Sequence, residues 1–243
     1  MLPLIILFTL LGSVISLAGS FVLLRKNVSQ NFSDELTNFA AGVLLSVAFL
    51  DLFPEALEAA GESNIFIPAL IGFISFFFAE RFIHLFHYHH GHGKNPSTFL
   101  VLIGDGVHNF VDGVAITASF LTSIPLGITT SLAVAAHEIP QEIADMGVLI
   151  NNGLSKSKAL FYNFLSALSA ILGALVAYFF ASTVQENLYI FLSVTTGFFI
   201  YISASDLIPQ IHEKYLENQK FSQIMFFFLG VVSVFIFTNT FCG

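Results

Sequence analysis

The chain has 243 residues, of which 56% are hydrophobic and only 10% are charged, and its mean hydropathy is +0.84. Ordinary soluble domains carry about 25% charged residues, so this composition excludes a soluble globular protein and indicates an integral membrane protein. The formal net charge of −8 says less, because acidic residues contribute little to membrane topology.

Eight apolar windows are long enough to cross a bilayer, whose hydrocarbon core of about 30 Å takes about 20 helical residues. They lie near residues 2–24, 37–58, 64–83, 98–121, 126–150, 158–181, 187–210 and 222–240. Each far exceeds the roughly 10 residues of a barrel strand, and lipid tolerates only helices or closed barrels. The first window has no basic stretch before it and no cleavage site after it, so we interpret it as a retained span. We predict an all-α fold, with one transmembrane domain of eight helices over residues 1–243.

The basic residues predict the orientation of the helices. All eight follow an odd-numbered window: Arg25, Lys26, Arg81, Lys94, Lys156, Lys158, Lys214 and Lys220. Because cytoplasmic connections carry the excess of Lys and Arg, these connections are expected in the cytoplasm and both termini outside it.

Two short segments suggest an internal repeat. The sequence DLFPEALE begins at Asp51 in the second window, and DLIPQIHE begins at Asp206 in the seventh. In the predicted topology these windows run in opposite directions, which is the pattern of an inverted repeat, here in a 3+2+3 arrangement, and many transporters are built this way. Both aspartates are candidates for a metal pathway.

Two polar islands interrupt the fourth and fifth windows. HNFVDG begins at His108 and HEIPQE begins at His137, each about 10 residues and therefore about 15 Å into its window, near the bilayer midplane. Spacings of four residues place His108 with Asp112 on one helix face and His137 with Gln141 on another. Pro140 lacks an N–H and is expected to free the carbonyl of Ala136 one turn earlier.

The carboxylates in and beside the two polar islands need a positively charged partner if they are ionised inside the membrane. A charged side chain at the bilayer centre costs about 2.5–3.5 kcal/mol, so the carboxylates here would together cost on the order of 10 kcal/mol unless they pair, protonate or line a wet cavity. They are Asp105, Asp112, Glu138, Glu142 and Asp145. No Lys or Arg lies nearby in the sequence, so a bound cation is the simplest partner. Imidazole with carboxylate suits zinc, and also ferrous iron, manganese or nickel, and the single cysteine, Cys242, offers no thiolate site.

HNFVDG followed by HEIPQE in consecutive windows resembles the ZIP family of divalent-metal transporters, and the resemblance covers the whole chain. The family has eight spans, both termini outside and a histidine-rich cytoplasmic loop between spans three and four. Here that loop, residues 84–97, contains His84, His87, His89, His90 and His92. Histidine-rich tracts bind metal by composition, so we expect a regulatory role for this loop, against a flexible linker as the alternative.

The resemblance implies a binuclear metal centre. Its candidate ligands are His108, Asn109, Asp112, His137, Glu138, Gln141 and Glu142. The first site would use His108, Asp112, His137 and Gln141, and the second would use Asn109 and Glu138 with Asp112 and Gln141 bridging. Gln141 departs from the family's second histidine and puts occupancy of two sites in question, whereas Glu142 keeps the closing glutamate. Asn163 matches a polar position in span six.

The implied function is transport of Zn²⁺ toward the cytosol, with Cd²⁺, Fe²⁺ and Mn²⁺ as further candidate substrates. Spans one, four, five and six would move against the others, by an elevator or a rocking motion. No P-loop is present, so an ion gradient, the membrane potential or cytosolic trapping would supply the energy. The expected partners are the metal ion and the lipid bilayer, with no nucleic acid, and a homodimer stays open. The short loops favour a bacterial-type inner membrane.

Two other functions compete with transport. HEIPQ resembles the H-E-x-x-H helix of zinc proteases and suggests an intramembrane hydrolase, although Gln141 replaces the second histidine and Pro140 lies inside the turn. A metal-sensing receptor without flux is the third reading, and its bound metal would saturate in proportion to protein. We expect a transporter and not an enzyme.

Overall fold

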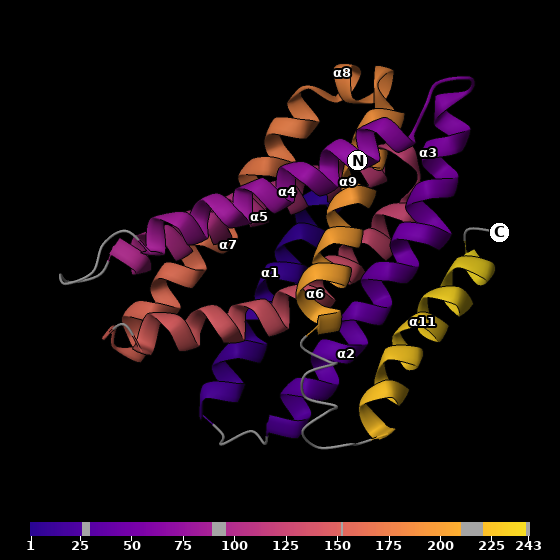
Figure 1. Cartoon of the computed structure of the whole chain (residues 1–243). Helices are drawn as coiled ribbons and strands as arrows, with labels where there is room; N and C mark the ends of the chain where they lie inside the picture. The colour runs from indigo at the N-terminus through magenta and orange to yellow at the C-terminus, as the bar shows by residue number, and fades with distance from the viewer. Residues whose placement is uncertain (26–29, 89–95, 152, 210–220, 242–243) are drawn as a thin grey trace.

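The computed structural model describes residues 1–25, 30–88, 96–151, 153–209 and 221–241, and all regular structure in these ranges is helical (Figure 1). The elements are α1 (Leu2–Arg25), α2 (Gln30–Val47), η1 (Ala48–Leu52), α3 (Phe53–Ala60), α4 (Phe66–Tyr88), α5 (Pro96–Thr122), α6 (Ile124–Asn151), α7 (Lys156–Phe179), α8 (Ala181–Glu186), α9 (Leu188–Tyr201), η2 (Ile202–Leu207) and α11 (Phe221–Phe241). The predicted all-α class is confirmed.

Polar side chains cap the N-termini of α4 and α7, which follow short connections. The Asn64 side chain accepts hydrogen bonds from the backbone N–H groups of Phe66 and Ile67 at 2.9 and 3.0 Å, at the start of α4. The Ser155 hydroxyl accepts one from the Lys158 N–H at the start of α7. These bonds satisfy N–H groups that have no partner inside the helix.

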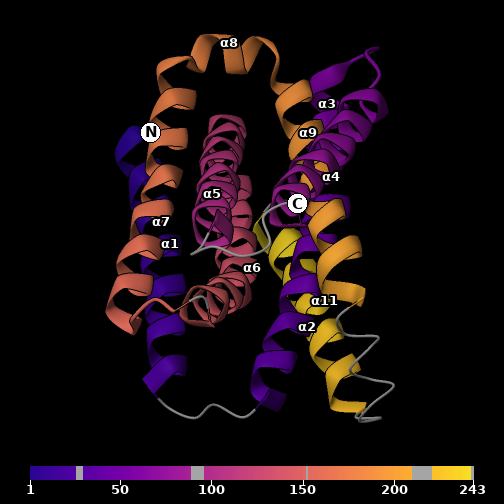
Figure 2. The same cartoon turned by 60° about the vertical axis from the view of Figure 1, so that its left-hand side comes forward.

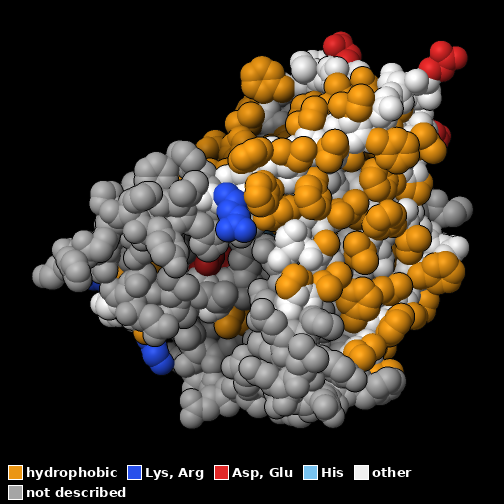
Figure 3. Space-filling model, in the orientation of Figure 1, with side chains coloured by type: hydrophobic (Ala, Val, Ile, Leu, Met, Phe, Trp, Pro, Cys, Tyr) orange, Lys and Arg blue, Asp and Glu red, His pale blue; other side chains and the backbone are white. Residues whose placement is uncertain are grey.

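Three segments of the described chain are long and apolar enough to cross a membrane: Glu35–Ala60, Lys156–Phe179 and Leu188–Ser205. Shorter apolar helices cover Leu2–Ala18, Phe66–Ala79 and Ile224–Thr240. Hydrophobic side chains cover most of the described part of the face in Figure 3, with acidic side chains at its upper edge. The chain therefore has the helices of a polytopic membrane protein, and the number of spans and their orientation stay predictions.

Two helix groups lie side by side (Figure 2). One contains α1, α5, α6 and α7, and the other contains α2, α3, α4, α9 and α11. Three helix pairs inside these groups meet at glycines: α5 with α7 at Gly113 and Gly173, α2 with α11 at Gly42 and Gly230, and α4 with α9 at Gly72 and Gly197. A Cβ atom at any of these six positions would lie 1.9–2.3 Å from a carbonyl oxygen of the facing helix. Glycine lets helix backbones approach this closely, as is common in membrane proteins.

The two DLxP segments share a local distortion. Asp51 lies in the π-helical turn η1 and Asp206 in the π-helical turn η2, and each follows a helix-pair glycine, Gly42 or Gly197, by nine residues. Such turns occur often at functional sites. The shared features extend the sequence match, while the inverted repeat itself stays a prediction.

Some expectations fall partly outside the described residues. His89, His90 and His92 lie outside them, as do the side chains of His84 and His87. The expected loop at 84–97 starts later than predicted, because α4 continues to Tyr88. The helix α6 continues through Pro140, so the proline does not end it, and the side chains of Pro140 and Asp206 are not described.

Candidate metal centre

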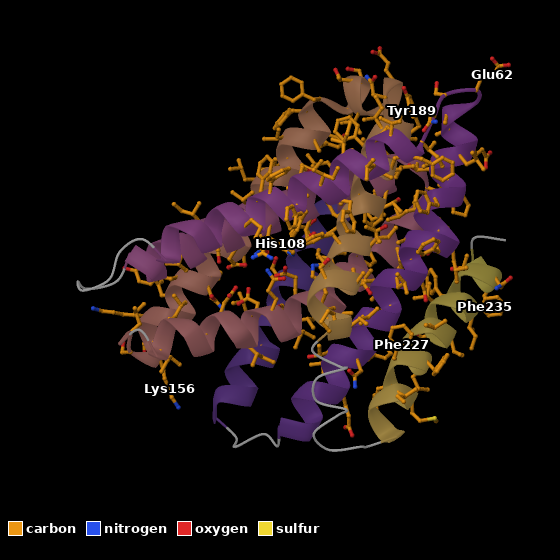
Figure 4. All side chains as sticks on the ribbon, viewed as in Figure 1. Glu62, His108, Lys156, Tyr189, Phe227 and Phe235 are labelled. Atoms are coloured by element: carbon orange, nitrogen blue, oxygen red, sulfur yellow. The ribbon has the colours of Figure 1, made fainter. Side chains whose placement is uncertain are left out.

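Four side chains from α5 and α6 form a compact group in the interior of the bundle. His108 and Asp112 come from α5, and His137 and Glu138 come from α6. All four are buried, and one nitrogen or carboxylate oxygen from each lies within 4.8 Å of the others. Figure 4 shows His108 inside the bundle. We call these four side chains the ligand group.

The imidazole nitrogens point at each other and at the carboxylates. The Nε2 atoms of His108 and His137 are 3.0 Å apart. Asp112 Oδ2 lies 3.5 Å from His108 Nε2 and 3.3 Å from His137 Nε2. Glu138 Oε1 lies 3.4 Å and 3.7 Å from the same two nitrogens. The five separations therefore range from 3.0 to 3.7 Å.

These five separations are close to the edge lengths of a tetrahedral zinc site, which has six edges. Zinc binds imidazole nitrogen and carboxylate oxygen at about 2.0–2.1 Å, which places neighbouring ligand atoms of a tetrahedron about 3.3 Å apart. Two neutral imidazoles with two carboxylates also leave a bound divalent cation with no net charge in the interior. The ligand group therefore fits one zinc-sized divalent cation in both size and charge.

Three atoms of the ligand group can each donate an electron pair to a metal ion. His137 Nδ1 lies 3.1 Å from the carbonyl oxygen of Ala133, one turn earlier in α6. A carbonyl only accepts, so Nδ1 carries the proton and Nε2 has its lone pair toward the group. Asp112 Oδ2 and Glu138 Oε1 are buried without a hydrogen bond, and their polar contacts are the longer ones to the imidazoles. Buried carboxylate oxygens normally have a partner, and a cation would supply it.

A second polar network lies beside the ligand group and reaches α7. The Asn109 amide donates to the backbone carbonyl and the carboxylate of Asp105, at 3.1 and 2.9 Å. The Ser166 hydroxyl donates to the other carboxylate oxygen of Asp105, and the Asn163 amide donates to the Glu142 carboxylate. Glu142 Oε1 and Asn163 Oδ1 are buried without a hydrogen bond. Oxygen ligands are thus available next to the ligand group.

Six of the seven predicted ligands lie in these two clusters. His108, Asp112, His137 and Glu138 form the ligand group, and Asn109 and Glu142 belong to the second network. Gln141 is half-buried. Ser166 was not expected from the sequence, because a serine in an apolar helix carries no signal until its partner Asp105 is known.

Asp51, a predicted pathway residue, lies apart from both clusters. It is buried, and its Oδ1 accepts a hydrogen bond of 2.6 Å from the Thr238 hydroxyl of α11. Its other oxygen is buried without a hydrogen bond. Its part in a pathway stays a prediction.

Comparison with known families decides what kind of protein carries this group. A sequence profile of the family described as ZIP Zinc transporter matches residues 2–98 and 87–238. The chain belongs to the ZIP family. The profile covers nearly the whole chain, and the second matched range contains the four residues of the ligand group.

Individual ZIP relatives share more than a third of the aligned positions. The metal cation symporter ZIP14 of Homo sapiens is 39% identical over 131 residues, which are 54% of this chain and 26% of that protein. The zinc transporter foi of Drosophila melanogaster is 36% identical over 135 residues, 56% of this chain and 19% of that protein. The zinc transporter ZIP6 of Homo sapiens is 36% identical over 138 residues, 56% of this chain and 18% of that protein. The aligned segment thus spans about a quarter or less of each of these relatives.

Membership in the ZIP family argues against the alternative that the chain is an intramembrane hydrolase. The family and these relatives are described as transporters, which confirms the expectation that the chain is not an enzyme. The hydrolase reading of HEIPQ is accordingly not favoured. ZIP transporters are membrane proteins, in agreement with the apolar helices.

Proposed function

We propose that this ZIP chain carries divalent metal cations, zinc foremost, across a membrane toward the cytosol, and that the ligand group on α5 and α6 is where the ion binds on its way. The observation that carries the proposal is the buried set of two imidazoles and two carboxylates, in which the five separations that involve an imidazole nitrogen are 3.0–3.7 Å. Cadmium and ferrous iron suit the same ligands and are the next candidates, followed by manganese.

The family supports transport over a metal receptor. The matched profile describes zinc transporters, and the human relative is described as a metal cation symporter. The two helix groups of Figure 2 offer a boundary at which the ion-binding helices α5 and α6 can move against α2, α4 and α9. The helix pairs that meet at glycines lie within a group, so motion at the boundary would leave them intact.

We propose that a second ion, when present, binds at the neighbouring network instead of bridging through Gln141. Asn109 and Glu142 already lie there, and the free oxygens of Glu142 and Asn163 supply two ligands. An amide oxygen is a weaker ligand than a carboxylate, so this second ion would bind less tightly than the first. A membrane of bacterial inner-membrane type and a homodimer also stay predictions.

Zinc accumulation in sealed proteoliposomes tests the proposal. We expect wild-type protein to load the vesicles with many zinc ions per protein, and we expect Asp112→Ala to abolish loading at equal incorporation. Binding that saturates at one or two ions per protein with no lumenal zinc would contradict transport and favour the receptor. Accumulation that persists in folded Asp112→Ala would show that the ion crosses elsewhere.

A further inference from the structure

Each imidazole of the ligand group contacts an aromatic ring that comes from the other helix group. The His108 ring meets Phe76 of α4 edge to face, at 5.2 Å between centroids and 78° between planes. The His137 ring meets Phe199 of α9 in the same way, at 6.0 Å and 65°. Neither phenylalanine can bind a metal, so their contribution concerns the surroundings of the ion.

The close contact between α4 and α9 helps to position one of these rings. Gly72 lies one turn before Phe76, and a Cβ there would be 2.3 Å from the Val194 carbonyl oxygen. Gly197 lies two residues before Phe199, and a Cβ there would be 2.1 Å from the Ala69 carbonyl oxygen. Gly72 and Phe76 lie one turn apart on the same face of α4, so the close approach of the two backbones helps to position Phe76, whereas Phe199 projects from a different face of α9 than Gly197.

Further rings complete an aromatic layer, which we define as Phe76, Phe198, Phe199 and Tyr201. Phe76 packs against both Phe198 and Tyr201 at 5.5 Å between centroids. Phe199 is only 1% exposed and Tyr201 only 4% exposed. Phe76 and Phe199 thus form the part of this wall of rings that touches the ligand group, and Phe198 and Tyr201 pack against Phe76.

Such a wall affects which ions the ligand group accepts. Apolar surroundings of a metal site control the access of solvent to the ion. Zinc, cadmium and cobalt(II) accept four protein ligands, whereas magnesium keeps several waters and manganese favours six oxygen ligands. The ligand group supplies four atoms, so a six-coordinate ion needs two further ligands, from the remaining carboxylate oxygens, from the neighbouring polar network or from water. Water on the side of the imidazoles would meet Phe76 and Phe199.

We propose that Phe76 and Phe199 determine metal specificity by keeping water out of the coordination sphere, so that the ligand group prefers ions that accept four protein ligands. They are positioning residues and donate no ligand. The inference rests on the proposed function, because it requires the ion to bind at the ligand group.

Visible absorption of bound cobalt(II) tests the inference on the purified full chain. Four-coordinate cobalt absorbs strongly and six-coordinate cobalt weakly, so the band intensity reports water entering the site. We expect an intense band for the wild type and a several-fold weaker band for Phe76→Ala and Phe199→Ala with cobalt still bound. The preference for zinc over manganese, from competition titrations, should fall by about 10-fold in the same variants.

Matched variants separate the layer from general effects of removing a ring. Phe73→Ala removes a phenylalanine one turn away on α4 whose ring packs on Tyr201 at 5.1 Å, and it should keep the intense band. Phe199→Leu retains most of the side-chain volume and should keep the intense band. If Phe199→Ala does not elute as a monodisperse peak, Phe76→Ala carries the test.

The outcomes distinguish this inference from the proposed function. An intense wild-type band that His108→Ala abolishes, with full intensity and full zinc preference in folded Phe76→Ala and Phe199→Ala, would overturn the inference alone. A wild-type protein that binds no cobalt, or a band that survives His108→Ala, would overturn the proposed site itself. A weakened band in the two alanine variants with an unchanged band in Phe73→Ala would support the inference.

Discussion

The substitution Gly113→Ala tests how the packing of α5 on α7 supports the ligand group. A Cβ at this position would lie 1.9 Å from the Ala170 carbonyl oxygen, 2.8 Å from the carbonyl carbon and 2.8 Å from the Ala174 backbone nitrogen. An ordinary C···O contact is about 3.4 Å, so the helices must move apart by more than about 1 Å. All three obstructing atoms belong to backbone, which cannot turn away as a side chain would.

This movement would reach the proposed metal ligands directly. Asp112 precedes Gly113, and His108 lies on the same helix, whereas His137 and Glu138 lie on α6. We therefore expect Gly113→Ala to lower zinc affinity by about 10–100-fold. The overpacked contact should also reduce the free energy of unfolding by about 1–3 kcal/mol.

The assay is zinc affinity by competition with a chromophoric chelator, together with thermal unfolding of the same purified samples. Gly12→Ala is the neutral control, because its Cβ would meet only the Ala135 Cβ, at 4.0 Å. Gly42→Ala is the packing control, since its Cβ would lie 2.1 Å from the Phe227 carbonyl oxygen at the contact of α2 with α11, away from the ligand group. It should lower the unfolding temperature and retain zinc affinity. Wild-type zinc affinity in folded Gly113→Ala would refute the reasoning.

Three more substitutions separate binding from stability. Asp112→Asn keeps the shape of the side chain but removes the negative charge beside both imidazoles. It should weaken zinc binding in the chelator assay by about 100-fold, since losing one partner of a buried charge pair costs about 2–5 kcal/mol. An unchanged zinc affinity would show that Asp112 is not a ligand. Gln141→Ala should leave the affinity for the first, tighter-bound zinc ion unchanged, because Gln141 is half-buried and lies outside the ligand group. A large loss of this affinity would show that Gln141 is a bridging ligand. Ser155→Ala removes the cap of α7 and should cost about 1 kcal/mol in chemical unfolding with zinc affinity intact; equal stability would show the cap to be dispensable.

Much of the fold followed from composition and spacing. Apolar windows predicted the helices because lipid leaves the backbone few alternatives, and the spacing of four residues correctly placed His108 and Asp112 on one face. Spacing within one helix could not show that His137 and Glu138, which are sequence neighbours, both enter the ligand group. They do so because the group lies between two helices, where side chains from both edges of an interface converge.

Contacts between distant helices were beyond the reach of the sequence. The bond between Ser166 and Asp105 depends on how α7 lies along α5, which the backbone contact at Gly113 and Gly173 fixes. A single glycine in an apolar helix does not reveal its partner helix. The aromatic contacts of Phe76 and Phe199 were equally hidden, because phenylalanine is common throughout this chain.

The most direct test of the central claim is zinc X-ray absorption spectroscopy of the purified protein loaded with one equivalent of zinc. The account predicts a four-coordinate ion with ligands at about 2.0–2.1 Å, two of them imidazoles, and the loss of one imidazole in both His108→Ala and His137→Ala. A six-coordinate zinc bound by oxygen alone, or a spectrum that neither substitution changes, would contradict the claim that these four side chains hold the ion.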